Sequence, residues 1–152
     1  MAVSFRCRWP LIIALPFLLA GCGGTPSGDH EPAYEDGTYR GGFFDRDQIQ
    51  VVVQVSLENN LVSEARVRQL AYGGTDYRLA EEGVPRGIAD QYRELLDHML
   101  GKDINQVIPE LYSPGEVVTE NAEVDGFTSA TIRSSKVISA LRDALNRGVY
   151  SY

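Results

Sequence analysis

The sequence predicts an α+β domain, in which an antiparallel sheet with an N-terminal hairpin region is packed by two main helices. Residues 48–57 alternate cleanly between apolar and polar side chains, which indicates a half-buried strand. Two later segments, 88–100 and 134–147, carry apolar residues at helical spacing. Strands clustered early in the chain and helices mainly late favour the α+β class.

Residues 1–21 have the features of an export signal. Arg6 and Arg8 precede the apolar run Trp9 to Ala20, and this is the order of the charged and hydrophobic regions in a secretory signal. A transmembrane helix needs about 20 apolar residues, so this run, which prolines also interrupt, is too short to span a membrane. We therefore expect residues 1–21 to be removed from the mature protein.

The sequence Leu19-Ala20-Gly21-Cys22 at the end of this segment resembles the bacterial lipobox. In lipoproteins of that kind the cysteine sulfur receives a diacylglyceryl group, and two acyl chains are enough for stable anchoring. The resemblance implies lipidation at Cys22 and a location on the extracytoplasmic side of the cell membrane or of an outer membrane. The alternative is an ordinary secreted protein that is cut at a small-residue site.

Composition excludes several kinds of functional site. Cys7 would leave with the signal and Cys22 would carry lipid, so the mature domain would have no thiol for a disulfide, a metal or a nucleophile. His30 and His98 are the only histidines and cannot form a metal cluster; we expect one in a solvated linker and one on a helix surface. The formal net charge of −7 opposes binding to nucleic acid or to anionic lipid headgroups.

The chain after the signal divides into two parts. Residues 22–36 are expected to form the lipid anchor and a flexible spacer, because they are rich in Gly, Pro and charge and show no apolar period. Residues 37–152 are long enough for one domain with its own core.

The sheet is expected to begin with three strands. The alternating strand Gln48–Leu57 leads into Glu58-Asn59-Asn60, and asparagine tolerates the positive φ of a tight turn. Residues Leu61 to Gln69 should therefore return antiparallel. Thr38 to Phe44 is expected to add a third strand, loosened at Gly41-Gly42.

Two amphipathic helices should cover this sheet. The first has apolar residues at helical spacing and ends at Gly101; they are Ile88, Tyr92, Leu95, Leu96, Met99 and Leu100. The second runs from about Ser134 to Arg147, with Lys136 and Arg142 outward and Gly148 at its end. Its inward residues are Val137, Ile138, Leu141, Ala144 and Leu145.

Between these helices, residues 124–135 are dense in hydroxyl and small side chains. From the residues alone this is a loop feeding a capped helix, because Ser and Thr are the ordinary N-cap residues. The run also resembles the flavinylation motif of the FMN-binding domain family, Asp-x-x-(Ser/Thr)-Gly-Ala-Thr-x-(Ser/Thr). The motif residues here are Asp125, Thr128, Ser129, Ala130 and Thr131, with Ser129 at the glycine position. The resemblance extends through the opening Asp36–Gly41, the alternating strand and hairpin, and the helix after the motif.

The resemblance implies that a magnesium-dependent flavin transferase joins FMN to Thr131 by a phosphodiester bond. A helix beginning just beyond Thr131 would offer free N–H groups and its positive dipole end to the phosphate. Arg133, which stands where the family commonly has Ser or Thr, would add a countercharge. The resemblance implies a cofactor-binding set of Asp125, Gly126, Thr128, Ser129, Ala130, Thr131, Arg133 and Ser134.

Other conspicuous residues have simpler interpretations. Tyr72, Tyr77 and Tyr92 could stack on an isoalloxazine ring, although tyrosines at a core edge are commoner. Arg66 and Arg68 alternate outward on their strand and indicate a solvated face. The carboxylate pairs Glu81/Glu82 and Glu120/Glu123 have no defined partner, so they predict no acid/base site.

The function expected from the resemblance is that of an extracytoplasmic electron-transfer lipoprotein that carries covalent FMN. Its partners would be the flavin transferase, a membrane or extracellular electron donor and acceptor, and the membrane itself through the lipid. A flavin-dependent reductase of a small acceptor is one alternative. A non-redox envelope module, in which the Thr/Ser run only caps a helix, is another. The chain is expected to be a redox carrier more than a self-sufficient enzyme.

Overall fold

The computed structural model describes residues 33–46, 48–118 and 126–151, and for residues 126–132 it describes the backbone alone. The predicted signal, Cys22 and most of the predicted spacer lie outside these residues. Within them, no helix is both long and apolar enough to cross a membrane.

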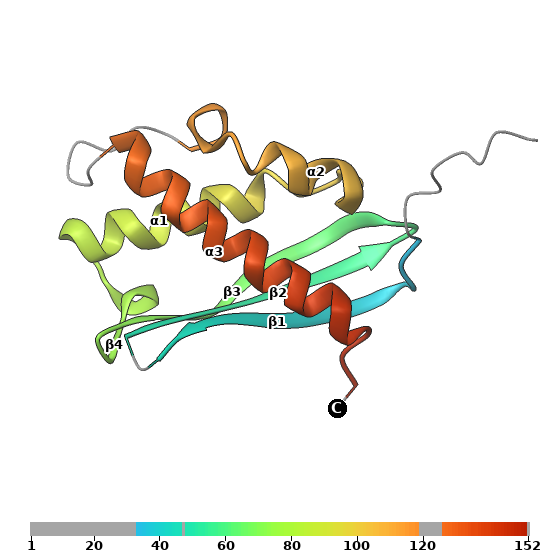
Figure 1. Ribbon diagram of the computed structural model, residues 1–152, viewed down its shortest axis with the longest axis horizontal. Helices are drawn as coiled ribbons and strands as arrows, with labels where there is room; N and C mark the ends of the chain where they lie inside the picture. The colour runs from blue at the N-terminus through green and yellow to red at the C-terminus, as the bar shows by residue number, and fades with distance from the viewer. Residues whose placement is uncertain (1–32, 47, 119–125, 152) are drawn as a thin grey trace, which may run out of the picture.

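Alternating side chains build a four-stranded antiparallel sheet, which confirms the predicted α+β class. Its strands are β1 (Gly37–Asp45), β2 (Ile49–Glu58), β3 (Leu61–Tyr72) and β4 (Thr75–Asp76), in the order β1-β2-β3-β4 (Figure 1). The expected inward residues Val51, Val53, Val55 and Leu57 of β2 are buried, and Ile49 is partly buried. The period of two therefore identified both the strand and its buried face.

The β2–β3 turn forms where the sequence placed it. Asn59 and Asn60 both have positive φ, 52° and 64°, as a two-residue hairpin turn requires. The chain before β1 packs against this turn: the Asn60 side chain accepts from the Tyr34 N–H at 2.8 Å, and the Asp36 carboxylate accepts from the Asn59 N–H at 2.6 Å. Tyr34 and Asp36, which lie at the end of the predicted spacer, are therefore bonded to the domain.

Three helices lie on one face of the sheet in Figure 1: α1 (Gly83–Asp97), α2 (Ile104–Glu110) and α3 (Gly126–Arg147). Two short 3₁₀ turns, η1 (Tyr77–Leu79) and η2 (Pro114–Glu116), complete the fold. α1 and α3 are the two main helices that the apolar spacing predicted. The helix α2 was not predicted, because its seven residues are too few to show a helical period.

Figure 1 also shows how the ends of the elements are arranged. The first described residues and the C-terminus lie at one end of the sheet, whereas β4, η1 and the starts of α1 and α3 lie at the other. The Tyr150 N–H donates to the Thr38 carbonyl at 2.6 Å, which ties the C-terminal residues to the beginning of β1. The predicted flavinylation segment is therefore at the end of the domain away from the point where the chain enters it.

The helix α3 packs against the sheet without a side chain between the two backbones at Gly41. A Cβ added at Gly41 would overlap the Ala140 carbonyl oxygen and the Ala144 nitrogen of α3. Around this contact Val137, Leu141 and Ala144 are buried. Next to it, the Asp143 carboxylate accepts from the Gly42 N–H at 2.9 Å. The contact explains why glycine occupies a position inside a strand, where it is otherwise unfavourable.

Gly41→Ala should therefore destabilise the domain, by about 3 kcal/mol, because either α3 or β1 must move to admit a methyl group. Urea unfolding of the chain from Gly23, followed by circular dichroism, would measure the loss. Gly42→Ala is the matched control, since its Cβ would meet the ring of the exposed Phe44, a side chain that can move. Equal losses in the two variants would contradict the proposed close contact.

Candidate functional site

The predicted flavinylation residues fall on the first two turns of α3. Gly126, Thr128, Ser129, Ala130 and Thr131 have helical backbone, while Asp125 lies outside the described residues. The expectation that the helix begins just beyond Thr131, at about Ser134, is therefore wrong. In the structure α3 already includes Gly126, so Thr131 lies within the helix, more than one turn from its first described residue. Free N–H groups at the helix start consequently do not lie directly after Thr131.

The helix α3 begins earlier than predicted because helix propagation is cooperative. Ser and Thr cost only a few tenths of a kcal/mol each relative to Ala in a helix, so a helix that packing has already formed continues through them. The density of hydroxyls was interpreted as a capping signal, but the same residue types are tolerated inside a helix whose later turns are anchored in the core.

Arg133, expected as a countercharge, is directed into the domain and is only 8% exposed. Its Nη1 donates to the Oε1 of Gln91, a buried side chain of α1. Burial lowers the pKa of Arg133, while the nearby Tyr72 and Tyr92 oppose that change. In the described structure, Arg133 thus joins α3 to α1; its contact with a phosphate stays a prediction.

Lys136, expected to point outward, is also only 8% exposed, and that expectation is wrong. It lies three residues after Arg133, so both cations are on adjoining turns of α3. Burial and the charge of Arg133 lower the pKa of Lys136, while Asp45, at the end of β1, opposes this. A lysine stem can pack against apolar neighbours along its length, which is why charge alone misplaced this residue.

Two of the three tyrosines noted in the sequence lie near enough to Arg133 to affect its pKa, and the third stacks on one of them. The Tyr72 hydroxyl of β3 lies 2.8 Å from the Tyr92 hydroxyl of α1, and Tyr92 is buried. The ring of Tyr77, in η1, stacks on Tyr72 with centroids 4.9 Å apart and planes inclined by 26°. We call Tyr72, Tyr77, Tyr92, Gln91 and Arg133 the Tyr–Arg cluster. It brings together β3, η1, α1 and α3 at one place.

The remaining predicted site residues divide between buried and exposed positions. Ser134 is buried, and its hydroxyl donates to the Leu111 carbonyl at the end of α2. Ser135 is exposed. Glu81 and Glu82 are exposed between η1 and α1, whereas Glu120 and Glu123 lie outside the described residues. No acid/base pair is therefore assembled from Glu81 and Glu82.

His98, directly after α1, belongs to a group of polar side chains between α1 and α2. Its Nε2 lies 2.8 Å from Glu110 Oε2, and the Lys102 amine lies 2.7 Å from the same oxygen. These two contacts lower the pKa of Glu110, with Lys102 the larger cause. Across the described part of the chain, no group of His, Cys, Asp and Glu side chains could hold a metal ion. His30 lies outside that part.

Three comparisons with known proteins gave no match: no family model, no curated protein and no solved structure resembles this chain closely enough to report. The resemblance to the FMN-binding domain family therefore stays a prediction from the residues quoted above. Gln91 was missed by the sequence analysis, since a buried glutamine on a helix has no pattern of its own. Arg133 and the three tyrosines were noted, but their common location was not predictable.

The Tyr–Arg cluster should make stability depend on pH in the alkaline range. Burial is the largest cause that raises the pKa of both Tyr72 and Tyr92 above the ordinary value of 10.0. The unfolded chain loses these protons first, so the free energy of unfolding should fall as the pH rises above about 10, with a slope of about 1.4 kcal/mol per pH unit for each such tyrosine.

Tyr92→Phe removes one of these groups and should make the slope shallower by about 1.4 kcal/mol per pH unit. Urea unfolding between pH 8 and 11.5 measures the slope in both proteins, and the pH 8 value gives each protein's own baseline. An unchanged slope in Tyr92→Phe would show that this hydroxyl is not kept protonated by the fold.

Proposed function

We propose that this chain is an extracytoplasmic electron-transfer lipoprotein, anchored through Cys22, with FMN joined by a phosphodiester bond to Thr131. The observation that supports the proposal is the location of the described part of the motif: residues 126–131 form the first described turns of α3, and Arg133 of the Tyr–Arg cluster follows them on the same helix. When bound, the flavin would supply the electron chemistry, and the protein would supply its attachment, orientation and surroundings.

The helix position of Thr131 fits an acceptor that a transferase must reach. Residues three and four apart adjoin on a helix, so position 131 shares a side of α3 with Ser134 and Ser135. Ser134 is buried and Ser135 is exposed, so this side is the border between the core and the surface. We propose that FMN is attached on this side of α3.

The residues around the start of α3 also suit a planar anionic group. Tyr72 and Tyr77 present a stacked aromatic pair, and Arg133 and Lys136 place two cations in the same part of the domain. Arg133 is two residues after Thr131, which places the two about 200° apart around the helix axis. We therefore propose that Arg133 acts mainly by positioning α3 against α1, so that the attached group meets a fixed surface.

The distance between the two ends of the domain is compatible with a membrane partner. A helix of 22 residues, such as α3, is about 33 Å long. The part of the predicted spacer before the described residues, 23–32, can extend about 35 Å at most. The lipid at Cys22 and the flavin at Thr131 would thus be attached at opposite ends of a domain that its spacer allows to turn toward the membrane.

Co-expression of the chain from Gly23 with a flavin transferase should give a protein that keeps its flavin after denaturation. The peptide that contains Thr131 should gain the mass of FMN less water. Thr131→Ala should abolish both signals, while Ser135→Ala, one turn further along α3 on the same side, should keep them. An adduct that persists in Thr131→Ala would overturn the proposed attachment.

A carrier and a reductase differ in what the reduced protein does afterwards. If the protein is a carrier, its reduced form should pass electrons to another redox protein in stopped-flow mixing and show little turnover with small acceptors alone. Sustained turnover with a small acceptor, at a rate that saturates, would instead favour the reductase alternative. A protein that stays colourless beside an active transferase would favour the non-redox alternative.

A further inference from the structure

The outer edge of β3 is uncovered over its middle. At one end, the Val62 N–H donates to the Lys102 carbonyl at 2.9 Å and the Val62 carbonyl accepts from the Gly101 N–H at 2.8 Å. At the other end, β4 pairs only with Ala71 and Tyr72. No backbone hydrogen bond described for this chain joins residues 64–67 to a segment beyond β3. A stretch of open strand edge therefore remains between two covered stretches.

The pairing of β2 with β3 determines which backbone N–H and C=O groups of β3 point toward its open edge. The backbone of Val62 points away from β2, and the register skips Ser63, which is the extra residue of a bulge. Since the groups of an antiparallel strand alternate between its two neighbours, the N–H and C=O of Ala65 and Val67 also point outward. Such groups form a template for an added strand.

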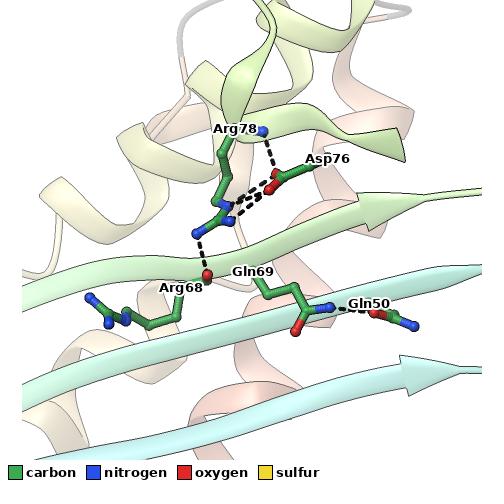
Figure 2. A network of polar contacts seen from close by, with 5 residues as sticks. All are labelled: Gln50, Arg68, Gln69, Asp76 and Arg78. Atoms are coloured by element: carbon green, nitrogen blue, oxygen red, sulfur yellow. Dashed lines mark hydrogen bonds and ion pairs between the residues drawn. The ribbon is translucent and has the colours of Figure 1, made fainter. Parts of the chain in front are cut away.

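Arg78 marks the limit of this template. Its guanidinium binds the Asp76 carboxylate through Nη2 at 2.6 Å and through Nε at 3.0 Å, and its Nη1 donates to the Arg68 carbonyl, as Figure 2 shows. The bond to Asp76 is the largest cause of a raised pKa in Arg78 and of a lowered pKa in Asp76. Arg78 thus satisfies one edge carbonyl and closes the edge beyond Val67.

A groove of about 340 Å³ runs between this edge and α1. Its floor is apolar and includes Ala65 and Val67 of β3, and Ala89 and Leu96 of α1. The two alanines contribute only methyl groups, which leaves room between strand and helix. The volume is within the range of natural binding sites, about 300–1,000 Å³.

The rim of the groove carries more positive than negative side chains. Arg66, Arg78 and Arg93 line it, against the single carboxylate of Asp97. Arg66 and Arg93 form ion pairs with Glu64 and Asp90, but their side chains are 63% and 40% exposed. Ion pairs this exposed contribute little, so a carboxylate of a ligand could share or replace them.

We propose that the groove between β3 and α1 binds an extended, acidic segment of a partner protein, which adds a strand to the edge at Ala65 and Val67. The strand's backbone would bond to the edge and its apolar side chains would face the floor; its carboxylates, which alternate with them, would lie on the other face of the added strand, beside Arg66. The charged residues Glu64, Arg66 and Arg68 on β3 oppose pairing with uncharged strands, which makes the edge selective. The proposal does not depend on the flavin.

Two fluorescently labelled peptides test the proposed strand addition: one has four Val-Glu repeats and the other has four Val-Lys repeats. Each is mixed with the chain from Gly23, and binding is followed by fluorescence anisotropy. This form keeps every described contact, since the structure describes residues from 33 onward. We expect the acidic peptide to bind and the basic peptide not to bind. On binding, the amide hydrogens of Ala65 and Val67 should exchange more slowly.

Arg66→Gln should weaken binding of the acidic peptide about fivefold to tenfold, because one charge-assisted bond is lost. Arg86→Gln is the matched control: Arg86 is also an exposed arginine in an ion pair, with Asp90 at 2.8 Å, but it does not line the groove, and it should leave affinity unchanged. Ala89→Leu should block the groove.

Equal affinity for the two peptides, or an equal effect of the two arginine variants, would overturn the proposal. So would slower exchange at Ala65 and Val67 that depends only on protein concentration, which would assign the edge to a dimer.

Discussion

The contact between α3 and β1 at Gly41 fixes the arrangement on which the rest of the domain depends. With no side chain at this position, the helix backbone rests directly on the strand, and the inward residues of α3 reach the valines of β2. The Asp143 carboxylate accepts from the Gly42 N–H, and this bond is the largest cause of its lowered pKa. The helix α3 and the edge strand β1 are thus joined by steric fit and by a charge-assisted hydrogen bond. These contacts, in the later turns of α3, determine the direction of the helix and therefore where its first turns lie.

The Tyr–Arg cluster then fixes the other end of α3. A buried cation is costly unless polar atoms surround it, and here the acceptor is a buried amide oxygen beside two tyrosine hydroxyls that are themselves hydrogen-bonded. Removing one of these partners would leave a buried polar group unsatisfied. The hydrogen bonds of the Tyr–Arg cluster therefore require one arrangement of its side chains, in addition to the packing that buries them. It holds the turn that follows position 131 in one orientation relative to β3 and η1.

Elements with a strong local pattern were predictable from the sequence, and those formed by tertiary contact were not. The alternation in β2 and the Asn59-Asn60 turn gave a strand, its inner face and the return strand correctly. β4 is two residues long and α2 seven, which is too little for any period to appear. Lys136 was misplaced because its charge was taken to decide its exposure, whereas its position on α3 decided it. In the same way, the meeting of Gln91 with Arg133 depends on how α1 crosses α3.

The helix α1 connects the two proposed surfaces of the domain. Its inner side carries Gln91 and Tyr92 of the Tyr–Arg cluster, while Ala89 and Arg93 line the groove along β3. The cluster and the groove adjoin, because Tyr77 directly precedes Arg78, which lines the groove, and Tyr92 lies one turn after Ala89 on α1. If FMN is attached at the start of α3, a partner held by a segment bound in the groove would therefore lie close to the flavin.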